Sequence, residues 1–389
     1  MIRTAPPARR HPRNVPRGGF LALLGILAGL TGARASAEGG GPTPSNLAIS
    51  DDGSRVLWEM AAIDTAAANS RARVYLWEPD ESLPDRIRRV FTGESLTGFA
   101  PRALTRRDED ARVPAFLPGD GAVSFLAARG ASARVQVWVL SLRGGEAEPW
   151  TSAAADVQTY AWAPDGTLFY IVGDELWRVA GGEPAERCEA VPAARELAIS
   201  FDGSRVAVPG TEALWILDVA TGEARVVDTA PWHPSAPRWA ESGDEVYFLA
   251  GADSSDARSP ASVFALDLKE GGVTHVAPRV EGEVLELESC PRSDKLFVRV
   301  REGANEPLYR LHPGSRKAFE LFEETGSVRD ISVKSNGEKV AFVWRSETSG
   351  PEIATWTFPD DHIEVLTTLQ TESAPEEDVP DDSKEQNDG

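Results

Sequence analysis

No nucleophile motif of the α/β-hydrolase kind is present in this sequence. Such an enzyme holds its serine in a Gly-x-Ser-x-Gly turn between a strand and a helix. The segment Gly93-Glu94-Ser95-Leu96-Thr97-Gly98 comes close, but it contains one residue too many and does not lie between a predicted strand and helix. We therefore expect no catalytic residues, and we expect that the chain is not an enzyme.

Metal-binding chemistry is not indicated either. Beyond the N-terminal segment the histidines are His233, His275, His312 and His362, and none has the spacing of a zinc or manganese site. The strands that we place nearest the centre of the fold contain no histidine. The recurring Asp residues are better explained as turn formers. We expect no metal ion and no other cofactor.

Any functional side chain must be positioned by a unit that the sequence repeats seven times. Its turn phrase is clearest at Trp162-Ala163-Pro164-Asp165-Gly166 and Ile199-Ser200-Phe201-Asp202-Gly203. Asp-Gly supplies the positive φ values that tight hairpins need. The seven phrases occupy residues 49–53, 116–121, 162–166, 199–203, 239–243, 288–294 and 333–337, and the last two are looser copies.

The fourth copy predicts four short antiparallel strands. They cover residues 196–200, 205–208, 213–218 and 224–228, with turn residues between them. The other copies fit the same template, and an aromatic residue recurs in the third strand of each.

Four-stranded units with a period of about 40–50 residues are typical of a β-propeller. One blade cannot bury both faces of its sheet, so blades pack face to face around an axis, with aromatic residues between them. We predict an all-β, seven-bladed propeller with four antiparallel strands per blade over residues 45–370. Six or eight blades are alternatives because the last two copies are weak. A β-sandwich is a further alternative, which the fixed order of the repeats disfavours.

The repeat resembles the WD40-like repeat known as PD40. The phrase at residues 162–166 and the strand that follows it are similar to the propeller repeat of the periplasmic protein TolB. They are equally similar to the N-terminal propeller of prolyl oligopeptidase-type serine peptidases. The resemblance covers about residues 45–369 and implies a propeller. TolB-like proteins carry an α/β domain before the propeller and the peptidases carry an α/β-hydrolase domain after it; we expect neither here.

Both ends of the chain differ from the repeat. Residues 1–18 hold five arginines and no acid, residues 19–30 are apolar, and the segment ending at Ala37 has an A-x-A pattern. This predicts a secretory signal peptide over residues 1–37, followed by a short linker at 38–44. An uncleaved anchor is the alternative. We expect a periplasmic or secreted protein with no membrane insertion after cleavage.

The C-terminal segment, residues 371–389, holds eight acids against the single Lys384. It has almost no apolar residue with which to offset the entropy of ordering, so it predicts a disordered acidic tail. An acidic tail that binds a partner is the alternative.

The net charge excludes some partners. The chain has 40 basic and 61 acidic residues, and without residues 1–37 the balance is 34 against 61, a formal charge of −27. This argues against nucleic acid and anionic membranes, which bind basic surfaces.

Cys188 and Cys290 lie in the third and sixth repeats, too far apart on a ring for a disulfide, so we expect two free thiols. We expect a monomer.

The ligand site is predicted on loops, which carry function more often than strands do. At one blade junction Trp232 and His233, with Arg238 just inside, form the most suggestive cluster, and we predict that they bind a ligand. The alternative is that Trp232 packs in the junction and His233 merely precedes a proline.

In the blade 1 insertion, residues 85–91 predict a short basic helix that caps the ring or docks a partner. The alternative is a solvent-exposed helix with no such role.

We therefore expect an exported, non-catalytic propeller that binds a protein or peptide. One alternative is a propeller subunit, or degenerate relative, of prolyl oligopeptidase-type peptidases that lacks the catalytic domain. Another is a propeller enzyme acting on glycans or peptides, because a fold does not dictate a function.

Overall fold

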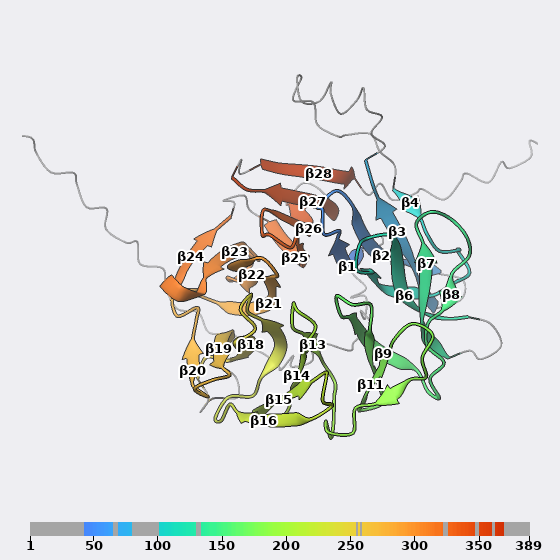
Figure 1. Cartoon of the computed structure of the whole chain (residues 1–389). Coiled ribbons are helices and arrows are strands. Elements are labelled where there is room, and N and C mark those ends of the chain that lie inside the picture. Colours follow the sequence, from blue (N-terminus) through green and yellow to red (C-terminus); the bar gives the residue numbers. More distant parts are fainter. Residues whose placement is uncertain are drawn as a thin grey trace, which may run out of the picture.

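The structure is a computed structural model that describes residues 43–64, 69–79, 101–129, 134–253, 256, 259–321, 326–346, 350–359 and 362–368. These residues form seven four-stranded antiparallel sheets, arranged as blades around a central axis (Figure 1). The fold is the predicted seven-bladed β-propeller, and the alternatives of six or eight blades are excluded. The predicted signal peptide, the helix at 85–91 and the acidic tail lie outside the described residues.

Each blade uses four consecutive strands, and its first strand lies nearest the axis. Blades 1 and 2 contain β1 (Pro44–Ile49), β2 (Val56–Asp64), β3 (Asn69–Trp77), β4 (Arg102–Ala103), β5 (Ala111–Phe116), β6 (Ala122–Ala128), β7 (Val135–Ser141) and β8 (Glu148–Pro149). Blades 3 and 4 contain β9 (Val157–Trp162), β10 (Leu168–Val172), β11 (Glu175–Val179), β12 (Glu186–Arg187), β13 (Ala198–Ile199), β14 (Arg205–Pro209), β15 (Ala213–Asp218) and β16 (Ala224–Asp228).

The remaining three blades follow the same order. Blades 5 and 6 contain β17 (Ser235–Trp239), β18 (Glu245–Gly251), β19 (Ala261–Asp267), β20 (Val273–His275), β21 (Glu283–Cys290), β22 (Ser293–Arg301), β23 (Leu308–His312) and β24 (Lys317–Glu320), with a short 3₁₀ turn, η2 (Pro313–Ser315), before β24. Blade 7 contains β25 (Gly326–Val333), β26 (Lys339–Ser346), β27 (Glu352–Thr357) and β28 (His362–Thr368).

The repeated turn phrase forms the hairpin between the first two strands of a blade. In blade 4 the backbone N–H of Gly203, at a φ of 75°, donates to Ser200 O at 2.8 Å. The Asp202 carboxylate accepts from the Ser200 hydroxyl at 2.6 Å and from the backbone N–H of Ser204 at 3.0 Å. These contacts confirm that the Asp of the phrase is a turn former.

Aromatic side chains fill the spaces between blades, as predicted. Trp58, Trp77, Trp239 and Trp356 are at most 1% exposed. Hydrophobic clusters join neighbouring blades: Leu57 of β2, for example, lies in one cluster with Phe125 of β6. Cys188 and Cys290 are buried and free, also as predicted. Burial raises the pKa of these thiols to about 11 and about 12, so both stay protonated and unreactive at neutral pH.

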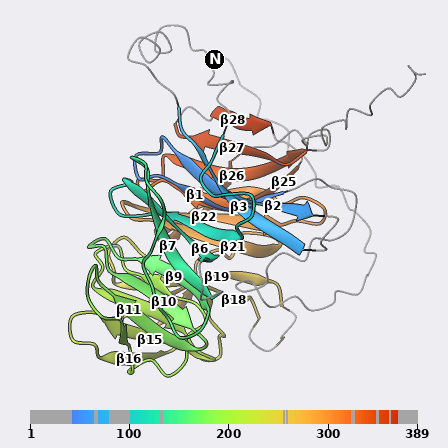
Figure 2. The ribbon, with the colours of Figure 1, turned by 90° about the vertical axis from the view of Figure 1, so that its right-hand side faces the viewer.

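The ring closes without a strand shared between its ends. Blades 1 and 7 lie side by side (Figures 1 and 2), and each uses only its own four strands. Across the seam the N–H of Ile49 donates to the Ser332 hydroxyl at 3.0 Å. Trp58 of β2 packs in one cluster with Ala341 of β26 and Ile353 of β27. Side-chain packing and side-chain hydrogen bonds therefore hold the ends together.

Bulges in several innermost strands turn a backbone N–H toward the preceding blade. Four non-glycine residues at these bulges have positive φ values, 51° at Asn46, 52° at Val113, 46° at Ala236 and 49° at Asp330. That conformation costs roughly 1–2 kcal/mol for such residues. A carboxylate of the preceding blade accepts the hydrogen bond in four seams: Asp330 from Asn46 (3.3 Å), Glu59 from Val113 (2.6 Å), Glu196 from Ala236 (2.6 Å) and Glu286 from Ile331 (2.8 Å).

Removing one of these acceptors should weaken the ring. Glu59 is 7% exposed and also accepts from the Ser45 hydroxyl at 3.2 Å. We expect Glu59→Ala to lower the free energy of unfolding by about 1–3 kcal/mol, because the Val113 N–H loses its partner. Glu59→Gln keeps an acceptor oxygen and should cost clearly less. Urea titrations of the three proteins measure this, and equal losses from both substitutions would contradict the account.

In blade 4 the second, third and fourth strands match the prediction to within one residue, whereas the first strand does not. The prediction placed it at residues 196–200, whereas β13 contains only Ala198–Ile199. Glu196 lies outside the ladder, and its carboxylate accepts a hydrogen bond from the N–H of Ala236 in blade 5.

Candidate functional site

The structure gives Trp232 and His233 separate structural partners. The Trp232 ring lies 4.3 Å from that of Phe264, centroid to centroid, and packs against a buried cluster of blades 4 and 5. His233 is exposed, and its Nδ1 lies 2.6 Å from Thr211 O. Trp232 therefore packs in the junction, which was the alternative weighed for it, while ligand binding by the pair stays a prediction.

Arg238 lies elsewhere, on the innermost strand β17. Its Nε and Nη2 donate to the Glu288 carboxylate of β21 at 3.2 and 2.6 Å, which ties blade 5 to blade 6. Arg238 thus shares no partner with Trp232 or His233. The three residues predicted to bind ligand are not brought to one cluster of contacts.

Substitution separates the packing role of Trp232 from a binding role. We expect Trp232→Ala to lower the free energy of unfolding by about 2–4 kcal/mol, because an aromatic ring leaves a partly buried cluster. His233→Ala removes only an exposed contact and should change stability by less than about 0.5 kcal/mol. Chemical denaturation measures both values. An unchanged stability of Trp232→Ala would contradict the packing role.

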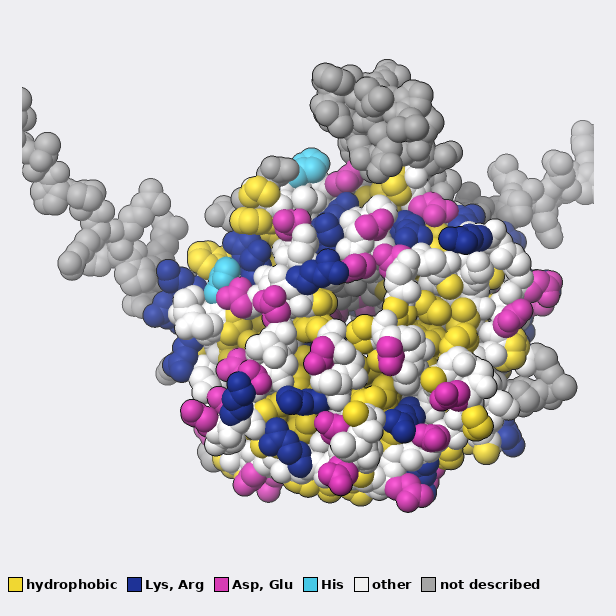
Figure 3. Space-filling view, in the orientation of Figure 1, with side chains coloured by type: hydrophobic (Ala, Val, Ile, Leu, Met, Phe, Trp, Pro, Cys, Tyr) yellow, Lys and Arg dark blue, Asp and Glu magenta, His cyan; other side chains and the backbone are white. Residues whose placement is uncertain are grey.

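A hollow of about 600 Å³ lies on the face that carries the hairpins between first and second strands. Figure 3 shows this face hollowed at its centre, with acidic and basic side chains around the hollow. We call it the channel mouth. Its lining comes from blades 1, 2, 6 and 7 and consists of Asp51, Asp52, Arg55, Gly119, Asp120, Arg292, Lys334, Ser335 and Asn336.

Some mouth charges are committed to the hairpins. Asp120 Oδ2 accepts from the N–H of Asp51 at 2.8 Å, and Arg55 Nη1 donates to Asp120 O at 2.9 Å. Burial raises the pKa of Asp120, although these neighbours partly oppose the shift. For Asp52, burial alone would raise the pKa, but hydrogen bonds from Ser50 and Ser54 hold it below its usual value.

Two mouth cations are held only loosely. Arg292 Nη2 lies 3.7 Å from Asp51 Oδ2, and the two side chains are 70% and 55% exposed. Lys334 Nζ lies 3.9 Å from Glu338 Oε2. The Lys334 side chain is only 23% exposed, whereas Glu338 is 55% exposed. The exposed Arg292–Asp51 pair contributes at most about 1 kcal/mol, and the Lys334–Glu338 contact is long, so a ligand carboxylate can replace these partners at little cost.

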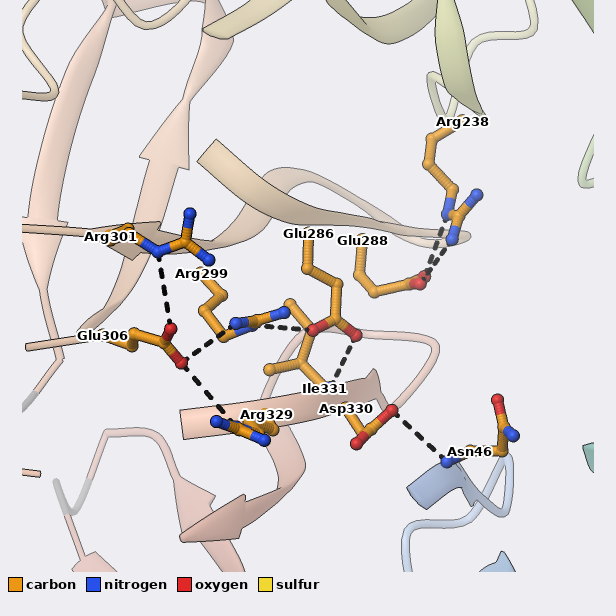
Figure 4. A network of polar contacts seen from close by, with 10 residues as sticks. All are labelled: Asn46, Arg238, Glu286, Glu288, Arg299, Arg301, Glu306, Arg329, Asp330 and Ile331. Atoms are coloured by element: carbon orange, nitrogen blue, oxygen red, sulfur yellow. Dashed lines mark hydrogen bonds and ion pairs between the residues drawn. The ribbon is translucent and has the colours of Figure 1, made fainter. Parts of the chain in front are cut away.

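A network of charged side chains joins blades 6 and 7 (Figure 4); Glu286, Arg299 and Glu306 are mostly buried, whereas Arg301 and Arg329 are exposed. Glu286 Oε2 accepts from Arg299 Nε at 3.2 Å, and its other oxygen accepts from the Ile331 N–H. Glu306 lies 3.1 Å from Arg299 Nη1 and within 4 Å of both Arg301 and Arg329, at 3.7 and 3.8 Å. Burial, and then the charge of Asp330, raises the pKa of Glu286 to about 7.

Blade 5 contains a serine–histidine pair. Ser262 Oγ lies 2.8 Å from His275 Nε2, but Ser262 is only 6% exposed. The His275 ring stacks on Phe264 at 4.8 Å, and burial lowers its pKa. Among the described residues no hydrogen bond joins His275 to a carboxylate of the kind that orients the histidine of a hydrolytic triad.

Within the described ranges no group of three or more His, Cys, Asp or Glu side chains is arranged to hold a metal ion. In the same part of the chain no helix is long and apolar enough to span a membrane.

Comparison with known proteins finds similarity in structure only. No protein-family model matches the sequence, and no curated protein matches it. The β-propeller domain of the Trilobed protease from Pyrococcus furiosus is similar with a TM-score of 0.62 and 14% identity, over 86% of this chain and 99% of that one. This chain shares the β-propeller fold of that domain.

Two whole peptidases match in the same way. A puromycin-hydrolyzing peptidase of Mycobacterium tuberculosis has a TM-score of 0.63 and 15% identity, over 86% of this chain and 54% of that one. An acylaminoacyl peptidase has a TM-score of 0.60 and 13% identity, over 84% and 52%. The chain thus spans about half the length of these two peptidases. At such identities the likeness concerns the fold alone.

The channel mouth was not predicted from the sequence, although eight of its nine lining residues, all but Arg55, belong to the repeated phrase. Asp51, Asp120 and Asn336 were treated only as turn formers. Hairpins between first and second strands meet at the axis of a propeller, so the charged residues inside those phrases were the available signal. The prediction favoured the other face of the ring, which carries the loops between blades and between second and third strands, because these loops vary more in sequence.

Proposed function

We propose that this chain is an exported, non-catalytic propeller that binds a peptide segment of a partner protein at its channel mouth. The observation that carries the proposal is the 600 Å³ hollow on the axis, lined by loosely paired charges of both signs. A hollow that several blades build together is well suited to hold one chain segment in a fixed orientation.

The chemistry of the mouth favours a peptide. Arg292 and Lys334 offer donors to carboxylates, while Asp51 offers an acceptor to amines and backbone N–H groups. Asn336 and Ser335 add neutral polar groups to the lining, although the Asn336 amide is bonded to Glu338 and Ser335 is 9% exposed. A nucleic acid would require a predominantly basic surface, which this mixture does not provide.

Export and oligomeric state rest on the sequence. The signal-peptide pattern of residues 1–37 supports a periplasmic or secreted location. We propose a monomer that meets its partner there.

A second candidate is a companion of a separate serine hydrolase. The similarity of the fold to propellers of peptidases favours this alternative. One of these similar structures is a propeller domain alone, and the match covers 99% of that domain. Under this alternative the captured partner is itself a hydrolase. Labelling of the purified complex with a fluorophosphonate would reveal one.

A photo-crosslinker at the mouth tests the proposal. It is placed at Asn336 and, as a matched control, at Thr221 in an exposed hairpin of blade 4. A third protein carries it at His233. The full chain is expressed in its native host and irradiated, and the crosslinked protein is identified by mass spectrometry.

We expect a partner at Asn336 that is absent at Thr221 and His233. A partner found only at His233 would place binding at the blade junction of Trp232 and His233 and would overturn the mouth proposal. Equal crosslinking at all three positions, or none at Asn336, would do the same.

A further inference from the structure

The outer edge of blade 6 carries a cluster of cations and aromatic rings. We call it the blade 6 patch and define it by Lys295, Arg310, His312, Arg316, Lys317 and Phe319. In Figure 3 dark blue and cyan side chains gather on the left edge, over this blade. Phe319 is 44% exposed, one of only two large apolar side chains of the described chain that are exposed.

Contacts between these residues show that the patch is continuous. The Arg310 guanidinium lies 5.7 Å from the Phe319 ring and 4.6 Å from the Phe358 ring of blade 7. Lys295 Nζ lies 5.1 Å from the same Phe358 ring. His312 pairs with Lys317 across the β23–β24 ladder. Burial is the largest cause that lowers the pKa of His312, and the positive charge of Arg310 is the next largest.

The patch cations lack acidic partners within the described chain. Arg310 Nε and Nη1 are buried with no hydrogen-bond acceptor, and the positive charge rests on aromatic faces instead. No ion pair involves Lys295, Arg316 or Lys317 among the described residues. Elsewhere the cations are commonly paired: Lys269 of blade 5, for example, lies 2.6 Å from Asp244.

The same chain contains a segment of opposite charge. Residues 371–389 hold eight acids and one lysine, and they follow β28, the outer strand of blade 7. Trp356 and Phe358 of blade 7 already contact Arg310, so blade 7 borders the patch.

The chain after Thr368 is long enough to bring the acidic segment to the blade 6 patch. The 21 residues after Thr368 span about 25 Å as a flexible chain and up to about 70 Å when extended. A globular body of this size has a radius of gyration of about 20 Å. The segment can therefore reach any part of the outer edge, and charge decides where it stays.

We propose that the acidic segment 371–389 docks in cis on the blade 6 patch. Its carboxylates pair with Lys317, Arg316 and Lys295 above the fixed charge of Arg310. Each exposed pair contributes at most about 1 kcal/mol, so several must act together. Tethering favours the contact through an effective concentration of the order of millimolar. The docked segment would keep acidic ligands in solution away from this patch.

Zero-length carbodiimide crosslinking of the full chain tests the proposal, since it joins an amine to a carboxylate in direct contact. The chain has only six lysines, at positions 269, 295, 317, 334, 339 and 384, so each link is assignable. The Lys269–Asp244 pair is the internal check that the chemistry worked. Links within one molecule are separated from links between molecules by mixing isotopically light and heavy protein.

We expect Lys317 to join the acids of residues 371–389 at least about tenfold more often than Lys269 does. Salt at about 1 M, where the Debye length is about 3 Å, should abolish these links. Arg316→Glu should reduce them while leaving Lys317 as the reactive amine. The matched control Arg143→Glu, an exposed residue of blade 2, should leave them unchanged.

Three outcomes would overturn the proposal. The first is the Lys269–Asp244 link without any link from Lys317 or Lys295 to the segment. The second is equal linking of the segment to Lys317 and Lys269, which would mean diffuse attraction. The third is linking only between molecules, which would make a second copy the occupant.

Discussion

Charge reversal at Arg292 and Lys334 is expected to weaken binding of the partner's peptide by at least about a hundredfold. Each reversal replaces an attraction to a ligand carboxylate by a repulsion, and a loss of about 1.4 kcal/mol per position corresponds to tenfold in affinity. Arginine is also among the residues that most often dominate interface energetics. Both cations are held loosely in the free protein, at 3.7 and 3.9 Å from their acidic neighbours. Arg292 is exposed, so its reversal should leave the fold intact, whereas the Lys334 side chain is only 23% exposed, so urea titration of the double variant must show that it is still folded.

Calorimetric titration measures this effect. The probe is a synthetic peptide that spans the segment identified by crosslinking at Asn336. The matched control is Arg134→Glu/Arg143→Glu, which changes the net charge equally at exposed residues of blade 2. An equal loss in both double variants would show that overall charge, not the mouth, governs binding.

The second large effect concerns the seam between blades 6 and 7. Burial raises the pKa of Glu286 from 4.5 to about 7, so the folded protein holds this proton more firmly than the unfolded chain does. Stability therefore falls as pH rises from about 4.5 through 7. In Glu286→Gln the side chain cannot ionise, yet its amide oxygen can still accept from the Ile331 N–H. The variant should gain stability relative to the wild type between pH 5 and 8, by up to roughly 3 kcal/mol.

The neighbours of Glu286 set the direction of this change. Asp330 and Glu288 oppose its ionisation, while Arg299 and the Ile331 N–H favour it, and burial outweighs them. Urea titrations of both proteins at several pH values measure the difference, with Glu223→Gln in an exposed turn as the control. Parallel stability curves for wild type and Glu286→Gln across pH 5–8 would contradict the raised pKa.

Local patterns made the fold predictable. Each Asp-Gly phrase specifies a hairpin through its own backbone, as the Ser200–Asp202–Gly203 contacts illustrate. The aromatic residue of each third strand marks a wedge between blades. Even the weak sixth copy forms a blade, because β21 and β22 pair directly across the short turn at Pro291 and Arg292.

The details of the seams were not predictable from one repeat at a time. The bulge at Val113, a β-branched residue at a positive φ, goes against local preference and persists because Glu59 of the preceding blade accepts a hydrogen bond from its N–H. The pairing of Arg238 with Glu288 likewise joins residues fifty positions apart in sequence. Such contacts depend on blade order around the ring, which local periodicity does not encode.

The candidate site was missed for a related reason. The residues of the mouth come from four separate blades, and each looks like an ordinary turn residue in its own repeat. Trp232 stood out because of its residue type, but its ring packs on Phe264. A prediction based on residue type alone therefore favoured Trp232 and overlooked the charged residues that four blades contribute to the channel mouth.

Hydrogen–deuterium exchange of the complex tests the central claim most directly. The account predicts slower exchange on partner binding in the turns around Asp51, Asp120 and Asn336, which line the mouth. Residues 229–235, around Trp232 and His233, should exchange at the same rate with and without the partner. Protection at 229–235 with no change in the three turns would contradict binding at the channel mouth.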